Sequence, residues 1–386
     1  MRSRLPTLAL LAGLLAGFAL AVFLGAAAEG YSKPDRFRRF HPFISPESLF
    51  YPTFASLENL ALAHWQPGKT LVIVGGNSVL NGVGQPEDRL WSLRLQELLG
   101  PNFVVVNLSF RGAFPSEAGA LVAESLLRRD VPVVYIANTS PGGVVRAFEG
   151  FYRHFFWAAR ARGALHDWPL REKDLSFRLA SLPDNTRRER EEEMRGAALD
   201  RWFHFQALWQ HVAYRYAFTV WNRVTGTSSW RARDAFPDDE TPPPPVAERF
   251  GPNLVREMEI VRSVTAPLAT PTPNGGWSVD TTRLASAGDD LEKTFPPSLR
   301  PRMLMLLSQS SPYHRTHLTA AERARDDAVF AAYAALWREH GIASAIYGTD
   351  FAVEDFHDRT HLTPSGGDKL AELVAREIRS LAQKKP

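Results

Sequence analysis

Five short apolar runs limit how this chain can fold more than any other feature of its sequence. Each run is flanked by Gly, Pro, Asn or Ser and is too short for a typical helix. The runs cover residues 71–74, 103–106, 131–136, 303–307 and 343–347. Continuous apolar runs of this length, without polar alternation, are typical of strands that are buried on both faces of a parallel sheet.

Segments with helical spacing and helix-start signals separate several of these runs. They are residues 87–99, a helix opened by Pro115-Ser116-Glu117 and running to Arg129, a helix opened by Thr319-Ala-Ala-Glu322, and a C-terminal helix opened by Thr363-Pro364. Thr319 and Glu322 have the spacing of a capping box, and proline is favoured in the first turn of a helix. Strands that alternate with helices predict an α/β fold with a doubly wound, mostly parallel five-stranded sheet.

The α/β pattern covers residues 69–144 and 300–386 and is interrupted between them. Residues 145–299 are rich in charged residues and tryptophan, and we interpret them as a largely helical insertion or lid. The charge run at residues 187–194 is typical of a solvated helix face. The tryptophans of this region are Trp157, Trp202, Trp209, Trp221 and Trp230. We expect them to be buried in the core, with a sugar-binding surface or a bilayer interface as alternatives.

The N-terminal residues 1–28 contain an uncharged apolar stretch from Leu5 to Ala28, preceded by Arg2 and Arg4. About 20 apolar residues suffice to cross a bilayer as a helix, and basic residues favour the cytoplasmic side. We expect a single-pass anchor in the inner (cytoplasmic) membrane, a juxtamembrane linker at 29–68, and a domain on the periplasmic, extracytoplasmic side. Small residues at 26–28 leave a cleaved signal peptide as the alternative.

Composition excludes several classes of function. The 386 residues contain no cysteine, so disulfides, thiolate metal sites and a cysteine nucleophile are excluded. The 45 basic and 42 acidic residues nearly cancel, and no basic stripe with interleaved aromatics is present, so nucleic acid is not an expected partner.

Ser78 follows the first predicted strand in the sequence Val74-Gly-Gly-Asn-Ser78. This places it at the carboxyl edge of the sheet, where α/β folds bind ligands. A serine hydroxyl becomes a nucleophile when a neighbouring base takes its proton. The alternative is a turn serine that caps the next helix.

Asp358 and His361 follow the last predicted strand and therefore belong to the same edge of the sheet. They are three residues apart, so the carboxylate can orient the ring from within one turn. A carboxylate in this place also stabilises the imidazolium that forms when histidine takes the proton of a serine. Together with Ser78, the pair has the composition of a serine hydrolase triad.

Four short sequence blocks resemble the conserved blocks of the SGNH (GDSL-type) hydrolase superfamily. Two of them contain Ser78 and the Asp358–His361 pair. In chain order the four blocks are Gly76-Asn-Ser78, Asn107-Leu-Ser-Phe-Arg-Gly112, Ile136-Ala-Asn138 and Asp358-Arg-Thr-His361. The resemblance implies an oxyanion hole made of the Ser78 and Gly112 backbone N–H groups and the Asn138 side-chain amide. The chain departs from the pattern at Asn77, where the family usually has Asp, and at Ile-Ala-Asn-Thr, where it usually has Gly-x-Asn-Asp.

The anchor, the divergent blocks and the insertion resemble one branch of that superfamily, which includes alginate O-acetylation proteins and the D-alanylation protein of teichoic acid synthesis. This resemblance implies acyl transfer, with O-acetyl the expected group, to or from a cell-envelope polysaccharide. It also implies a membrane-bound O-acyltransferase as partner, and no cofactor. A simple carbohydrate esterase, and a non-catalytic scaffold or polysaccharide-binding partner, are the alternatives.

Two rival interpretations concern the histidines. His357 and His361 have the i, i+4 spacing of zinc-binding helices, but Pro364 predicts that the helix begins after them, so no metal site is expected. His317 lies in an echo of the Asp358–His361 sequence and is an alternative base, although it has His314 where the carboxylate should be. Asn77, Arg111 and His317 are the candidates for lining the substrate cleft.

Overall fold

A five-stranded parallel sheet forms the centre of the protein. The computed structural model describes residues 5–31, 52–143, 145–212, 224 and 244–383. The strand order is β2-β1-β3-β6-β7, and the strands are β1 (Thr70–Val74), β2 (Phe103–Asn107), β3 (Val133–Thr139), β6 (Met303–Ser308) and β7 (Ala343–Tyr347). The prediction of an α/β fold with a five-stranded parallel sheet is confirmed, and each strand overlaps one of the five apolar runs.

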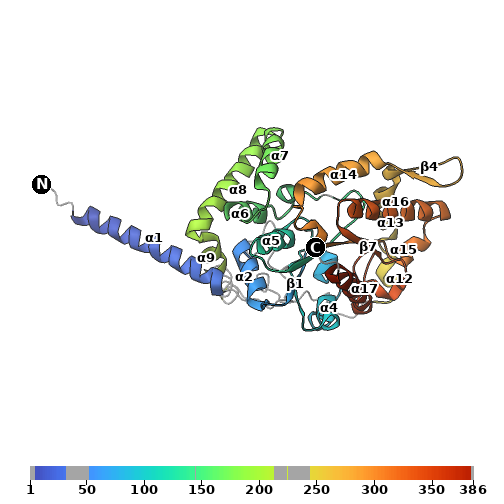
Figure 1. Cartoon of the computed structure of the whole chain (residues 1–386), viewed down its shortest axis with the longest axis horizontal. Helices are drawn as coiled ribbons and strands as arrows, with labels where there is room; N and C mark the ends of the chain where they lie inside the picture. The colour runs from blue at the N-terminus through green and yellow to red at the C-terminus, as the bar shows by residue number, and fades with distance from the viewer. Residues whose placement is uncertain (1–4, 32–51, 144, 213–223, 225–243, 384–386) are drawn as a thin grey trace.

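Helices cover both faces of the sheet because successive strand residues point to opposite sides. Leu71 and Ile73 pack against α2 (Phe54–His64) and α5 (Ala118–Leu127) in one apolar cluster, which also contains buried residues of α16 (Ala320–Glu339). Val72 and Val74 belong to a second cluster with α4 (Trp91–Leu99) and α17 (Pro364–Gln383). The result is a layer of strands between two layers of helices (Figure 1).

The sheet order reverses between β1 and β3. From β1 the chain moves outward to β2 and then returns to the other side of β1 for β3. Val74 at the end of β1 pairs with Ile136 of β3, so the loop after β1 lies beside Asn138. A crevice forms outside the carboxyl ends of the strands at such a switch point. Ser78 follows β1 at this place.

Helix boundaries mostly follow the sequence signals. The capping box at Thr319 and Glu322 is confirmed, with both reciprocal hydrogen bonds present. The helix expected from Pro115 begins only at Ala118, because the Glu117 carboxylate turns back and accepts the N–H groups of Phe114 and Tyr152. Burial raises the pKa of Glu117 to about 7, although these two bonds act against the rise.

Residues 145–299 are mostly helical in the described parts. The helices are α6 (His154–Ala161), α7 (Trp168–Ala180), α8 (Asp184–Phe203), α9 (Phe205–Val212), α12 (Val246–Phe250), α13 (Leu254–Thr265) and α14 (Thr281–Thr294). The pattern did not predict the short antiparallel hairpin of β4 (Ala269–Pro271) and β5 (Trp277–Val279). Trp157 is buried in the core as expected, but Trp202 and Trp209 are exposed, so the expected core placement is wrong for these two. The helix α8 has no buried residue, and Trp221 and Trp230 lie outside the described residues.

The N-terminal helix α1 (Leu5–Tyr31) extends away from the rest of the protein (Figure 1). It is long and apolar enough to cross a membrane over Pro6–Glu29. Of the residues expected to form a linker, 32–51 lie outside the described ranges. The helix α2 falls within the expected linker, and its residues Phe54, Leu57 and Leu60 are buried in the core.

Candidate active site

The loop after β1 places Ser78 at the first position of a one-turn helix, α3 (Ser78–Asn81). Asn77 caps this helix, with its side-chain oxygen accepting the Val79 N–H at 3.0 Å. Gly76 has a φ of +88°, and a Cβ there would lie 2.4 Å from the Asn138 side-chain oxygen. Glycine is therefore required for the loop to approach β3. The Ser78 N–H has no acceptor among the described residues, as is usual at a helix start.

Asn138 at the end of β3 is joined to Asn77 by two hydrogen bonds. Its side-chain oxygen accepts the Asn77 N–H at 3.1 Å, and its amide nitrogen donates to the Asn77 side-chain oxygen at 2.7 Å. A carboxamide nitrogen has two protons, so this pair leaves the second one available to another acceptor. The capping and pairing bonds of Asn77 need only an acceptor oxygen, which its carboxamide supplies.

The structure brings Ser78, His361 and Asp358 into one hydrogen-bonded chain. His361 Nε2 lies 2.7 Å from Ser78 Oγ, and Nδ1 lies 2.6 Å from Asp358 Oδ2. A carboxylate only accepts, so Nδ1–H donates to Asp358 and Nε2 of the neutral ring accepts from the serine hydroxyl. The second oxygen of Asp358 accepts the backbone N–H groups of Thr360 and His361, both at 2.8 Å.

These bonds control the charge of Asp358. Burial alone would raise the pKa of this carboxyl, but the bonds to His361 and to the two backbone N–H groups hold the pKa well below its ordinary value. Asp358 is therefore ionised at neutral pH. A fixed negative charge at Nδ1 holds the ring in one tautomer and orientation.

A tight turn holds this loop, and it is not helical. The His357 N–H donates to the His361 carbonyl at 2.7 Å, and Phe356 and Leu362, both buried in the core, form a β-bridge beside it. The two histidines thus do not share a helix face, as a helical zinc motif requires. No group of three or more His, Asp or Glu side chains placed to hold a metal ion occurs in the part of the chain that the structure describes.

The loop after β2 lies against the Ser78 loop. The Phe110 N–H donates to the Gly76 carbonyl at 3.0 Å, and the Asn81 side chain donates to the Ser109 carbonyl at 2.9 Å. Gly112, two residues further on, has a φ of +74° that favours glycine. Within the described ranges, its N–H has no acceptor, and no hydrogen bond joins Gly112 to Ser78 or Asn138.

Two further candidates are not joined to this chain of bonds. The Arg111 carbonyl accepts the Tyr152 hydroxyl at 2.7 Å, which fixes the backbone next to Gly112. His317 is exposed, donates from Nδ1 to the Tyr313 carbonyl at 2.9 Å and packs on the Tyr313 ring. His361 is thus the histidine that is hydrogen-bonded to Ser78, whereas His317 contacts Tyr313 of the preceding helix.

A second serine–histidine–carboxylate array lies next to the first. His314 Nε2 donates to Glu257 Oε2 at 2.6 Å, and Nδ1 lies 2.8 Å from Ser311 Oγ. The Ser311 N–H donates to the carbonyl of Arg359, the residue after Asp358, at 2.9 Å. The sequence echo drew attention to His314, but no local pattern indicated Glu257, because it lies 57 residues away on insertion helix α13.

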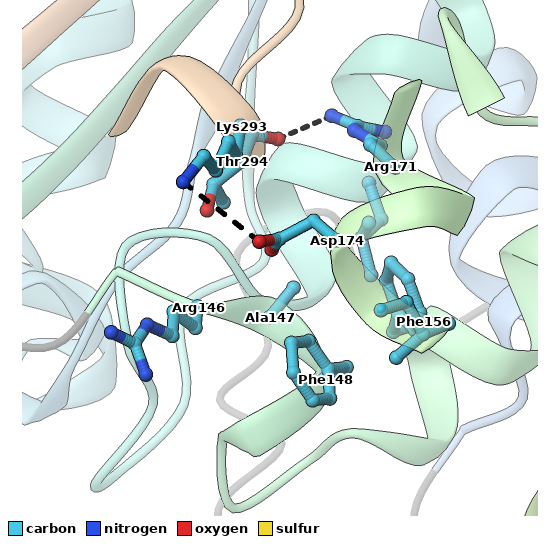
Figure 2. Close-up of a pocket in the computed structure, with 10 residues that line it drawn as sticks. Arg146, Ala147, Phe148, Phe156, Arg171, Asp174, Lys293 and Thr294 are labelled. Atoms are coloured by element: carbon cyan, nitrogen blue, oxygen red, sulfur yellow. Dashed lines mark hydrogen bonds and ion pairs between the residues drawn. The ribbon is translucent and has the colours of Figure 1, made fainter. Parts of the chain in front are cut away.

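Polar contacts also join the insertion to the core at α7 and α5, away from the contact between α13 and His314. Arg171 of α7 bonds both oxygens of the buried Glu124 on α5, at 2.7 and 2.8 Å. Figure 2 shows Arg171 also donating to the Thr294 carbonyl, while Lys293 pairs with Asp174 at 3.9 Å. The cavity between these residues has a volume of about 30 Å³, which is room for about one water molecule. We therefore interpret it as a packing contact between the insertion and the core.

The arrangement around Ser78 has the parts of a nucleophilic acyl-transfer site: a hydroxyl, a base and an orienting carboxylate. The side chains of Ser78, Asp358 and His361 are all partly exposed, so a ligand can reach them. A scan against models of known protein families finds no match, and a search of curated proteins finds no significant relative.

Proposed function

We propose that this protein is an extracytoplasmic serine enzyme that transfers an acyl group, O-acetyl by resemblance, to or from a cell-envelope polysaccharide. The single observation that carries the proposal is the chain Ser78–His361–Asp358, with separations of 2.7 and 2.6 Å. Chance proximity does not explain these bonds, since the loop is pinned by backbone bonds that leave the ring facing the serine.

In the proposed reaction, Ser78 Oγ attacks the ester carbonyl while His361 Nε2 takes its proton. Asp358 stabilises the imidazolium, and the negative charge develops on the former carbonyl oxygen. The Ser78 and Gly112 N–H groups and the second Asn138 amide proton are the proposed donors to that oxygen. Donors of this type contribute roughly 3 kcal/mol each in other enzymes.

Collapse of the tetrahedral intermediate breaks the bond to the alcohol, which leaves with the proton of His361. The acyl group stays on Ser78 as an ester. His361 then takes a proton from water or from a sugar hydroxyl, which attacks the acyl-enzyme, and Ser78 leaves with that proton. Water gives net ester hydrolysis, and a sugar gives transfer.

The membrane location is part of the proposal. Two arginines precede α1, which favours a cytoplasmic N-terminus and an exported domain. The end of α1 is bonded to the domain, because Glu29 pairs with Arg162 and His204 at 3.1 and 3.0 Å. Gly25 and Ala28 are buried there as well. These contacts favour an uncleaved anchor over a signal peptide that is removed after Ala28.

The resemblance, rather than the geometry, supports a polysaccharide acceptor and a membrane-bound O-acyltransferase as donor partner. Transfer is favoured over a simple carbohydrate esterase for the same reason. A non-catalytic scaffold or polysaccharide-binding role is the alternative from another class. It is disfavoured because the nucleophile, the base and the carboxylate are all in place.

The test uses the full-length protein in detergent, a fluorophosphonate probe and intact mass measurement. We expect a mass gain of one probe, absent in Ser78→Ala. Ser311→Ala is the matched control, because it removes the serine of the buried array and should keep the label. No gain in folded wild-type protein would overturn the enzymatic proposal and support the scaffold.

A second measurement separates transfer from hydrolysis. The protein is incubated with a chromogenic acetyl ester, with and without an oligosaccharide that carries free hydroxyls. A transferase yields an acetylated oligosaccharide at the expense of acetate. An esterase releases acetate at a rate that the oligosaccharide does not change.

A further inference from the structure

The free part of α1 is too short to cross a bilayer alone. Residues 6–20 are exposed, and from residue 21 onward the helix becomes partly buried against the domain. Fifteen helical residues span about 22 Å, whereas the hydrocarbon core is about 30 Å thick. If α1 crosses the membrane, part of the domain that contacts its second half lies at the level of the lipid.

The contacts identify that part of the domain. Phe18 packs on Phe203 and Phe205, at the junction of α8 and α9, with ring centroids 5.1 and 5.7 Å away. Gly25 lies against the backbone of His204, where a Cβ would be 2.4 Å from the carbonyl oxygen. Figure 1 shows α9 beside the second half of α1. The α8–α9 junction therefore accompanies α1 into the membrane region.

Large apolar side chains are exposed at this junction. We call them the anchor-side surface: Leu199, Trp202, Phe205, Trp209 and Val212, with exposed fractions of 58, 67, 41, 52 and 40%. Exposed clusters of large apolar residues mark a binding surface, and tryptophan is enriched where a protein meets the headgroup level of a bilayer. Because the surface continues directly from α1, lipid is the occupant that fits it.

An arginine-lined cavity of about 360 Å³ lies next to this surface. Its walls include Arg128, Arg129, Arg162 and Arg201, with Glu58 as the acidic member. Arg162 bonds Glu29 in the last turns of α1, and Arg201 lies over the Trp202 ring at 5.1 Å. Four guanidinium groups face two carboxylates, Glu58 in the wall and Glu29 on Arg162, so the net charge is positive and favours an anion. Arginine suits the phosphate of a lipid headgroup.

We propose that the anchor-side surface is embedded in the leaflet from which the domain emerges, and that the arginine-lined cavity binds the phosphate headgroup of an anionic lipid there. The inference rests on the proposed membrane anchorage by α1. Two attachments, the helix and this surface, fix the rotation of the domain about α1. A domain held by α1 alone would turn freely.

The chain has no cysteine, so single cysteines can carry a nitroxide label in the otherwise unchanged full-length protein. We would label Trp202→Cys and Trp209→Cys in vesicles of phosphatidylcholine and phosphatidylglycerol. Leu14→Cys in α1 is the bilayer control. Val255→Cys on α13, at the far side of the molecule in Figure 1, is the water control. Oxygen reports lipid exposure, and a water-soluble nickel chelate reports aqueous exposure.

Labels at 202 and 209 should collide more with oxygen than with nickel, like the label at 14 and unlike the label at 255. Nickel-accessible labels at 202 and 209 with a lipid-exposed label at 14 would overturn the inference and leave the anchor intact. A nickel-accessible label at 14 would overturn the anchorage itself. Protection of 202 and 209 from both reagents would mean a protein contact and also contradict lipid. Leu199→Cys is the second variant should either tryptophan change impair folding.

The headgroup site is tested by native mass spectrometry of full-length protein titrated with phosphatidylglycerol. Arg128→Gln with Arg129→Gln should weaken lipid binding about thirtyfold, because each arginine near an anionic surface raises the affinity roughly fivefold. Inorganic phosphate at equal concentration should not displace the lipid. Equal binding by the variant, or displacement by phosphate, would overturn the lipid assignment of the cavity.

Discussion

Ser78–His361–Asp358 and Ser311–His314–Glu257 contain the same kinds of group but differ in how the histidine is attached. In the first array the carboxylate is bonded to Nδ1 and the serine to Nε2. In the second array the serine is bonded to Nδ1 and the carboxylate to Nε2. Both arrays meet the same loop, because the Ser311 N–H is bonded to the carbonyl of Arg359.

Their surroundings separate them further. Ser311 and His314 are fully buried, so an ester has no access to that serine. The Ser311 N–H already has an acceptor, whereas the Ser78 N–H has none among the described residues. A serine–histidine–carboxylate composition therefore does not define a catalytic site. Access and unoccupied donors near the hydroxyl distinguish the proposed active site from an array that connects insertion helix α13 to the loop that carries Asp358 and His361.

The largest contrast is expected between the two histidines. His361→Gln removes the proposed base and should lower kcat/KM for a chromogenic acetyl ester by about 10³-fold or more. His314→Gln should keep kcat/KM within about tenfold but lower the melting temperature by several degrees, because it disturbs one buried and one partly buried hydrogen bond. Equal loss of activity in both variants, with unchanged melting temperatures, would break the distinction.

The second contrast concerns Asp358. Asp358→Asn keeps the shape of the side chain but removes the charge that orients the ring and stabilises the imidazolium, so kcat should fall by about 10²- to 10⁴-fold. The variant should still bind substrate, so KM should change much less than kcat. A fall confined to KM would contradict the role given to Asp358. Steady-state kinetics at neutral pH distinguishes the two results.

The sequence predicted the elements that depend on local pattern. Four of the five strands are mostly buried apolar runs, whereas β7 at the edge of the sheet is only partly buried before Tyr347. The end of β3 and the residues that follow β1 and β7 meet because parallel strands end at one edge. Ser78, Asn138 and Asp358 therefore lie together in the structure as their positions in the sequence suggested. The capping box at Thr319 was predictable for the same local reason.

What depends on distant packing was not predictable. Trp157 is buried and Trp202 is exposed, although each has at least one arginine and two phenylalanines within five residues. Glu257 reaches His314 only because α13 folds back onto the strand end. Burial and long-range ion pairs decide these features, and a single sequence records neither. The helix α2 and the β4–β5 hairpin are different, because the N-cap Thr53 and the turn sequence Asn274-Gly275 are local signals that could have predicted them.

The two arrays should respond to acid in different pH ranges. Burial lowers the pKa of His314, with Glu257 acting against this and with Asp358 and Arg359 also nearby. As the pH falls, His314 is therefore protonated at a higher pH in the unfolded chain than in the folded protein. The folded state should lose stability as the pH drops below about 6.5. The folded-state pKa of Asp358 is also lowered, so its stabilisation is present above about pH 4 and is lost as the pH falls below that.

Melting temperatures between pH 8 and pH 3 test this separation. His314→Gln should flatten the decrease between pH 7 and pH 5 and leave the decrease below pH 4 unchanged. Asp358→Asn should do the reverse, with a small effect because its side chain is 39% exposed and solvent screens the charge. His154 and His166 are present in both variants, so the difference between the curves isolates the two arrays. Superimposable curves would contradict the assignment.

The smallest effect is expected at Glu257, and it tests whether the insertion does more than hold the loop. Glu257→Gln keeps an oxygen that can accept the His314 Nε2–H but removes the charge of a carboxylate that is 22% exposed. We expect the melting temperature to fall by about 2 °C or less and the rate of fluorophosphonate labelling at Ser78 to stay within about threefold. The lowered pKa of His314 leaves its ring largely neutral at pH 7, and the glutamine oxygen preserves the hydrogen bond. A labelling rate that fell as far as in Asp358→Asn would show that the charge on α13 reaches Ser78 through Ser311 and Arg359. The second array would then belong to the active site, since an array that merely holds the loop depends on the hydrogen bonds that glutamine preserves.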